Sequence, residues 1–294
     1  MSVVSDMIRH NFKKGDDVRD AGLKTPEDIE RFDDIVYGEN PKWQVLDVYR
    51  PKAAGDKELP VIVSVHGGGW VYGDKERYQY YCMSLAQHGF AVVNFTYRLA
   101  PDYKFPAPLE DLNLVINWIL QNARQYHFDT KHIFGVGDSA GAHQLGLYSA
   151  MCTNEKYAQE FPFQVPEGFV PTAIALNCGA YLIETKNAKD DLTIKLMADY
   201  LPEKGTKEEF YKIGVVNHMT EQFPPTFYMT CTGDFLVSQA PVLSEKLIEK
   251  KIPHEFHFYG DEKHELGHVF HCNIKLEEAK KCNAEECDFF KKFC

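Results

Sequence analysis

The 294-residue sequence lacks the features that mark membrane and secreted proteins. No apolar stretch is long enough to cross a bilayer, and the first residues, Met1 to Arg9, lack the apolar core of a secretory signal. None of the 8 cysteines sits in a CxxC pair, so the cysteine pattern favours neither a metal site nor a redox site. We therefore expect a cytoplasmic protein that has no membrane partner.

Basic residues are also in short supply. The sequence has 32 lysines and arginines against 43 aspartates and glutamates, which gives a formal net charge of -11. This excess of negative charge argues against nucleic acid as a partner. With 44% hydrophobic and 26% charged residues, the composition is that of an ordinary globular protein.

The cysteines are best explained by packing. In a reducing compartment most of them would be small buried hydrophobic residues. Cys282, Cys287 and Cys294 fall with Phe289 and Phe290 on a predicted amphipathic helix, where we expect them to pack against the core.

Apolar runs alternate with helical patterns from about residue 60 onward, which predicts an α/β fold with a mostly parallel central sheet flanked by helices. A helix over 109–125 carries an apolar face. Two regions interrupt the alternation and are predicted to form a helical cap. Residues 1–40 are predicted to contain short helical pieces, and residues 186–216 contain two helical patterns. Without repeats or long linkers, residues 1–294 are expected to form a single domain. The predicted strands are 61–66, 91–95, 133–136, 173–176, 226–230 and 256–259.

A pentapeptide, Gly137-Asp138-Ser139-Ala140-Gly141, separates the strand that ends at 136 from a helical run over 140–151. This G-x-S-x-G pattern between strand and helix predicts a sharp turn that exposes a serine nucleophile. The start of the following helix supplies free N–H groups and a positive field beside the hydroxyl. Asp138 is expected to order the neighbouring loops, and His143 is expected to be structural.

A second motif, His66-Gly67-Gly68-Gly69-Trp70, directly follows the strand at 61–66. Consecutive glycines leave backbone N–H groups unshielded, as a loop that approaches an oxyanion requires. A phosphate-binding loop is the competing interpretation, but neither the G-x-x-x-x-G-K-[ST] nor the G-x-G-x-x-G pattern is present.

Together with the run from Tyr97 to Leu112, these ordered motifs resemble the hormone-sensitive-lipase-like carboxylesterases of the α/β-hydrolase fold, including bacterial acetyl esterases. The resemblance implies a Ser-His-Asp triad in the chain order nucleophile, acid, histidine. It also implies an oxyanion hole made of the N–H groups of Gly68, Gly69 and Ala140. Trp70 and Tyr72, beside this loop, are expected to narrow the substrate pocket.

Asp234 is the predicted acid, because it lies just past a strand end where such sheets present their catalytic groups. Its alternative role is to cap the helix that leads to Lys250. His268 is the predicted base, since His268-Val269-Phe270 fits the family pattern of a histidine, a small residue and an aromatic, with valine in the place where glycine is more common. His264 and His271 remain the alternatives.

The rival chemistry is a zinc metallopeptidase, because His264-Glu265-Leu266-Gly267-His268 matches the H-E-x-x-H motif. The metzincin extension is absent, since His271 and Ile274 occupy its glycine and histidine positions. Gly267 also disfavours the helix that the motif needs.

The sequence therefore predicts a serine carboxylesterase that hydrolyses small-molecule esters with short, acetyl-like acyl groups, acetylated sugars among them. No metal or organic cofactor is expected. A hydrolase-fold binding protein without catalytic activity is the remaining alternative, although all three triad positions are occupied.

Overall fold

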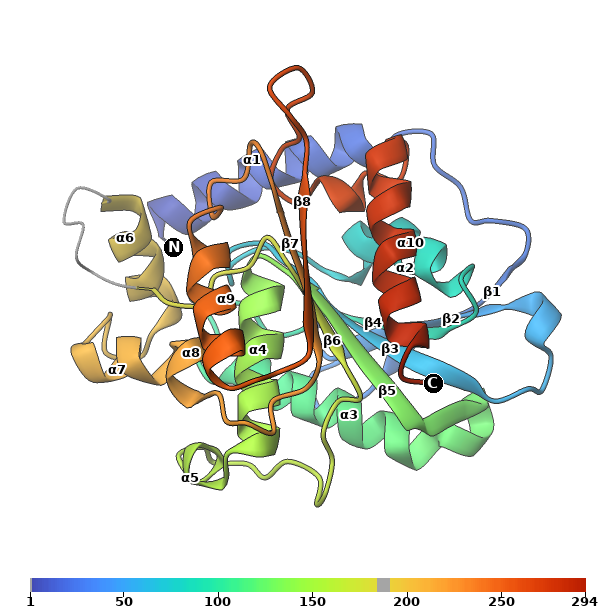
Figure 1. Cartoon of the computed structure of the whole chain (residues 1–294), viewed down its shortest axis with the longest axis horizontal. Coiled ribbons are helices and arrows are strands. Elements are labelled where there is room, and N and C mark those ends of the chain that lie inside the picture. The colour runs from blue at the N-terminus through green and yellow to red at the C-terminus, as the bar shows by residue number, and fades with distance from the viewer. Residues whose placement is uncertain (1, 184–190) are drawn as a thin grey trace.

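A computed structural model describes residues 2–183 and 191–294 (Figure 1). Its strands form one eight-stranded sheet in the order β1-β2-β4-β3-β5-β6-β7-β8. β2 is antiparallel to both of its neighbours, and the strands from β4 to β8 in this order are parallel. The strands are β1 (Ile29–Val36), β2 (Val45–Pro51), β3 (Leu59–Val65), β4 (Ala91–Phe95), β5 (Phe128–Asp138), β6 (Ile174–Asn177), β7 (Thr226–Cys231) and β8 (His254–Tyr259).

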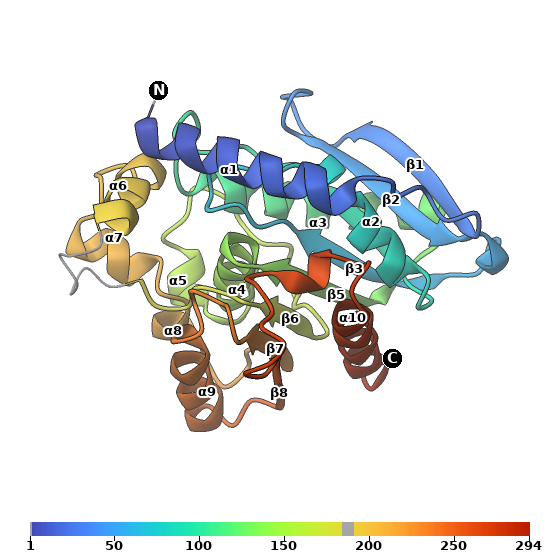
Figure 2. The same cartoon turned by 90° about the horizontal axis from the view of Figure 1, so that it is seen from above.

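Helices cover both faces of this sheet (Figures 1 and 2). The α-helices are α1 (Val3–Asp20), α2 (Lys75–Ala86), α3 (Ala107–Tyr126), α4 (Ala140–Thr153), α5 (Glu155–Ala158), α6 (Asp191–Tyr200), α7 (Lys207–Lys212), α8 (Val215–His218), α9 (Gln239–Glu249) and α10 (Glu277–Lys291). Short 3-10 helices occur at η1 (Lys52–Ala54) and η2 (Phe270–Cys272).

Alternating side chains of the central strands pack into two hydrophobic layers, one on each face of the sheet. In β3, Val61, Val63 and Val65 pack with α3, α4 and α9, whereas Ile62 packs with α2 and α10 on the other face. Burial on both faces explains why the parallel strands are continuous apolar runs in the sequence. The predicted mostly parallel sheet flanked by helices is confirmed, and each predicted strand matches an observed one.

The strands β1 and β2 were not predicted. β1 lies in the region expected to contain only short helical pieces, so that expectation is wrong for residues 29–36. β1 is an edge strand that carries acidic residues and a register irregularity between Phe32 and Ile35, which hides the alternation of a strand. The same region also holds α1, a continuous helix of 18 residues.

The helix α1 runs past α3 and α2 (Figure 2) and packs against the loops that follow β3 and β4. Arg9 anchors it by donating to the carbonyl groups of Val71 and Ala100. Ser5 donates to Asp199 of α6, which joins two segments that were predicted as cap. Residues 186–190 of the second cap segment lie outside the described residues, and the rest of it forms α6, α7 and the start of α8.

The C-terminal helix α10 buries Cys282 and Cys287 against the sheet, as predicted, whereas Cys294 lies beyond the helix and is exposed. None of the helices formed by residues 2–183 and 191–294 combines the length and the apolar character that crossing a membrane requires.

Candidate active site

Ser139 occupies a strained turn between β5 and α4. Its backbone lies in a positive-φ conformation (φ 51°, ψ -117°) that residues other than glycine rarely adopt, and its N–H donates to the carbonyl of Asn177 on β6 over 2.9 Å. As the N-cap of α4, its hydroxyl makes no capping hydrogen bond. The turn therefore presents a hydroxyl that is not engaged by the helix it precedes.

The glycine loop after β3 runs beside this turn. Gly68 has φ 119°, and a Cβ placed there would lie 2.1 Å from the carbonyl oxygen of Tyr72, so only glycine fits. Within the described part of the chain, no backbone acceptor takes up the N–H groups of Gly68 and Gly69. Ala140, the first residue of α4, has no intrahelical acceptor for its N–H either.

Asp234 and His268 form a hydrogen-bonded pair at the ends of β7 and β8. His268 Nδ1 lies 2.6 Å from Asp234 Oδ1. The same carboxylate accepts from the Thr230 hydroxyl at 2.6 Å and from the Leu236 N–H at 2.8 Å. Burial acts to raise the pKa of Asp234, but the His268, Thr230 and Leu236 hydrogen bonds outweigh it and hold this pKa below its usual value.

The carboxylate therefore stays ionised at neutral pH. A proton on Nδ1 of His268 then makes the favourable hydrogen bond, which leaves Nε2 as the acceptor of the ring.

The two alternative histidines lie in different surroundings. The His264 side chain is 73% exposed and its Nδ1 lies 3.6 Å from Asp261. His271 is fully buried, and burial lowers its pKa to about 3. Residues 264–268 form a bend at His264, an isolated bridge at Gly267 and the start of a turn at His268. The helix that would bring two zinc-binding histidines to one face is not formed by this segment.

Asp138, next to the serine, ties the two loops together. Its carboxylate accepts from the Tyr78 hydroxyl at 2.8 Å, and that hydroxyl accepts from the Gly67 N–H at 2.9 Å. Burial raises the pKa of Asp138 to about 6, against the effect of the Tyr78 hydrogen bond. The expectation that Asp138 orders the neighbouring loops is confirmed.

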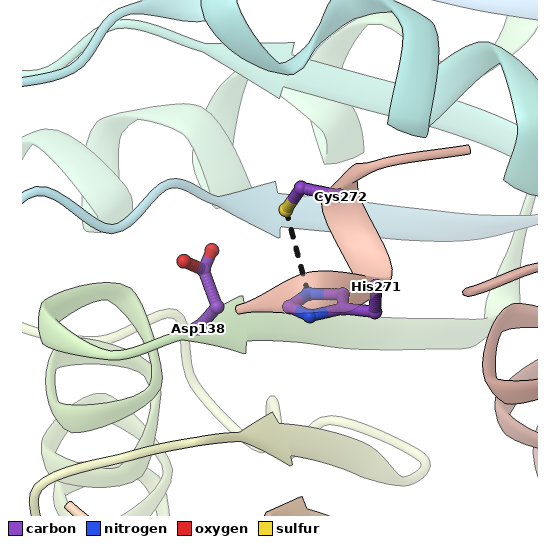
Figure 3. A group of neighbouring side chains, drawn as sticks. All are labelled: Asp138, His271 and Cys272. Carbon is purple, nitrogen blue, oxygen red and sulfur yellow. Dashed lines mark hydrogen bonds between the residues drawn. The ribbon is translucent and has the colours of Figure 1, made fainter. Parts of the chain in front are cut away.

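Two groups of described side chains have the residue types and spacing of metal ligands. One is Asp138 with His271 and Cys272, whose potential ligand atoms all lie within 4.8 Å of one another (Figure 3). In this group Cys272 Sγ and His271 Nε2 lie 3.6 Å apart in a hydrogen bond, and burial keeps the pKa of the Cys272 thiol well above its usual value. The other is Cys178 with Asp234 and His268, where the hydrogen bond between the latter two already uses the ligand atoms. We assign no metal to either group.

A cavity of about 640 Å³ opens beside Ser139 and Ala140. Its walls come from α1, α6 and α7, where Ile8, Phe12 and Met197 are among the apolar lining residues. No charged side chain of the described residues lines it. These wall residues were not identified from the sequence, because their helices meet the serine only through tertiary packing.

Trp70 and Tyr72 lie differently with respect to this cavity. Trp70 lines it, and its indole Nε1 donates to Nδ1 of the buried His143 over 3.1 Å. His143 Nε2 lies 2.8 Å from the carbonyl oxygen of Ile213, so the histidine holds the indole in place, as a structural residue would. Tyr72 points toward α1, where its hydroxyl donates to Asp16, and it is not among the described residues that line the cavity.

The fold and the position of these groups define an α/β-hydrolase. Over 99% of this chain and 96% of the other, the structure superposes on an inhibited esterase B from Lactobacillus rhamnosis with a TM-score of 0.87 at 23% identity. An esterase from the archaeon Pyrobaculum calidifontis matches with a TM-score of 0.78 at 21% identity, covering 98% and 93% of the two chains. At these identities the likeness establishes the fold.

The BD-FAE family model matches residues 46–250, which is more than half of the sequence. The chain therefore belongs to the BD-FAE family. It is 33% identical over 129 residues to esterase LipC of Mycobacterium tuberculosis, covering 44% of this chain and 32% of LipC. It is 29% identical over 215 residues to an esterase of Gibberella moniliformis, covering 69% of this chain and 65% of that esterase. This chain thus spans about a third of the length of LipC and just under two thirds of the length of the Gibberella esterase.

The resemblance to the hormone-sensitive-lipase-like esterases that the three motifs indicated is confirmed by these comparisons.

Proposed function

We propose that this protein is a serine ester hydrolase with Ser139 as nucleophile, His268 as base and Asp234 as the acid that orients the base. The observation that carries the proposal is the 2.6 Å hydrogen bond between His268 Nδ1 and Asp234 Oδ1, at the same edge of the sheet as the strained Ser139 turn. The names of the relatives, which are esterases, support the same chemistry.

The proposed reaction begins with proton transfer. His268 Nε2 takes the hydroxyl proton as Ser139 Oγ attacks the ester carbonyl carbon. Asp234 keeps the imidazole in the tautomer that leaves Nε2 unprotonated, and its negative charge stabilises the imidazolium that forms. The imidazolium then protonates the leaving alcohol, and a water molecule, activated by the same imidazole, releases the acyl group from the serine.

The negative charge on the carbonyl oxygen requires donors that are already in place. The N–H groups of Gly68, Gly69 and Ala140 are proposed to supply them, because no described backbone acceptor competes for the glycine N–H groups and the helix leaves that of Ala140 free. Loss of one such donor typically costs about 100- to 1000-fold in rate. The proposed chemistry requires no metal or organic cofactor.

The proposed substrates are small uncharged esters with short acyl groups, positioned by Trp70. Tyr72 would support the glycine loop, since its N–H donates to the Gly68 carbonyl over 3.0 Å. The cavity presents few polar side chains among its described lining residues, namely Asn11, Ser139, Thr193 and Gln239. An apolar ester fits such a lining better than an acetylated sugar, whose hydroxyl groups need hydrogen-bond partners. One relative is named versiconal hemiacetal acetate esterase, which supports an acetyl or similarly short acyl group.

The proposal is tested by hydrolysis of p-nitrophenyl acetate and p-nitrophenyl butyrate. We expect the wild-type protein to hydrolyse both, and Ser139→Ala to lose about 10⁶-fold in kcat, down to the detection limit. A fluorophosphonate probe should label the wild type and not the variant. Activity that survives Ser139→Ala but disappears with a chelator would indicate zinc chemistry, and a wild type that neither turns over nor reacts with the probe would indicate a binding protein.

A further inference from the structure

Phe235, the residue after the acid Asp234, has an unusual environment for a large apolar side chain. It is 67% exposed, although it borders the cavity. Its ring faces the imidazole of His268, with ring centroids 4.0 Å apart and planes inclined by 38°. A side chain that is this exposed gains little stabilisation from hydrophobic burial. Burial therefore does not explain why residue 235 is a phenylalanine. The ring contact with His268 is its distinctive interaction.

The backbone around Phe235 explains how this contact is held. The Leu236 N–H donates to Asp234 Oδ1 at 2.8 Å, and the Val237 N–H donates to the Asp234 carbonyl at 3.1 Å. These two bonds form a tight turn with Phe235 in its middle. The turn that aims the carboxylate at Nδ1 of His268 therefore also sets the phenyl ring against the face of the same imidazole.

We propose that Phe235 is a positioning residue for the base, and that the π face of its ring stabilises the imidazolium form of His268. This inference rests on the proposed function. An aromatic ring attracts a cation that lies within about 6 Å of its centroid. When the proton moves from Ser139 Oγ to His268 Nε2, the positive charge appears next to the ring. Asp234 stabilises that charge from the edge of the imidazole, and Phe235 stabilises it from the face.

The proposal distinguishes the π face from mere apolar bulk. Phe235→Leu keeps an apolar side chain and removes the ring, whereas Phe235→Trp keeps an aromatic face. Phe256→Leu is the matched control, because Phe256 is also exposed, at 47%, but lies on the edge strand β8 and is not a described lining residue of the cavity.

The experiment is a pH profile of p-nitrophenyl butyrate hydrolysis from pH 5 to 9. For Phe235→Leu we expect kcat to fall about 2- to 5-fold and the acidic limb of kcat/KM to move to lower pH by about half a unit. The direction follows because loss of the π face disfavours the protonated base. Phe235→Trp and Phe256→Leu should retain the wild-type profile, and all variants should keep the wild-type melting temperature within a few degrees.

A rise in KM without a change in kcat or in the pH profile would overturn the proposal and make Phe235 a substrate contact. Equal losses in Phe235→Leu and Phe235→Trp would also overturn it. Failure of the proposed function is distinguishable, because in that case the wild type itself would show no turnover that depends on Ser139.

Discussion

At the scale of single residues, the site depends on hydrogen bonds that fix protonation states. Asp234 accepts from Thr230, from the Leu236 N–H and from His268, and these bonds keep its pKa low in spite of burial. The ionised carboxylate in turn selects the Nδ1-protonated tautomer of His268. Ser139 needs this tautomer, because only an unprotonated Nε2 can accept its proton.

Asp234→Asn tests this dependence. An amide can donate to Nδ1, which favours the wrong tautomer, so we expect kcat for p-nitrophenyl butyrate to fall by about 10⁴-fold at neutral pH. His264→Gln is the control, since the His264 side chain is 73% exposed and lies away from this pair, and it should retain wild-type kcat. A large loss in His264→Gln together with a small loss in Asp234→Asn would assign the base to His264.

At the scale of elements, the serine turn requires the start of α4 to pass very close to β3. A Cβ built on Gly141 would lie 2.0 Å from the carbonyl oxygen of Val65 and 2.6 Å from that of His66. Both obstacles are backbone atoms, which cannot rotate away as a flexible side chain can. Because α4 is buried along nearly its whole length, the helix cannot retreat without opening the core.

Gly141→Ala should therefore be strongly destabilising, although alanine has the higher intrinsic helix propensity. We expect a loss of about 1–3 kcal/mol or more in the free energy of unfolding, with a lower kcat because Ser139 and Ala140 are displaced. Gly15→Ala in α1 is the matched control, since no other group lies within 4 Å of the point that its Cβ would occupy, and it should be neutral or stabilising. Urea unfolding measures the stability of both variants. If Gly141→Ala were as stable as Gly15→Ala, the close approach of α4 to β3 would be contradicted.

At the scale of the whole molecule, a buried carboxyl group joins α10 to the sheet behind the site. Glu286 accepts from Asn177 at 2.6 Å and from the Tyr81 hydroxyl at 2.9 Å, and the Asn177 carbonyl accepts the Ser139 N–H. Burial raises the pKa of Glu286 to about 7, although both hydrogen bonds oppose the shift. The C-terminal helix is thereby coupled to the strand that supports the serine turn.

This raised pKa predicts how stability changes with pH. Between about 4.5, the usual pKa of the group, and about 7, the unfolded chain releases the proton while the folded protein retains it, so the stability contributed by Glu286 falls as pH rises. The total loss is about 3 kcal/mol above pH 7. Glu286→Gln carries no charge at any pH, so its melting temperature relative to wild type should be higher at pH 8 than at pH 5.

Thermal unfolding at the two pH values measures this difference. Glu277→Gln, a substitution at an exposed position of the same helix, is the control. Its effect on the melting temperature should be the same at pH 5 and at pH 8. A pH-independent effect of Glu286→Gln would show that the buried group does not titrate in this range.

Much of the fold and of the candidate site could be predicted because the relevant signals are local. The parallel strands are short apolar runs, and the serine and glycine turns need particular residues at adjacent positions. β1 escaped prediction because an exposed edge strand tolerates acidic residues and an irregular register. The histidines could only be ranked from the sequence, since His264, His268 and His271 lie within one short segment.

The sequence by itself determined the parallel strands β3 to β8, the serine turn, the glycine loop and the family, because each depends on residue types at neighbouring positions. Only the tertiary structure decided that His268 meets Asp234, that Phe235 lies against His268, and that α1 and α6 wall the cavity. These contacts join segments distant in sequence or depend on how side chains orient at the sheet edge. No local pattern encodes them, because they form only when the two hydrophobic layers pack against the sheet.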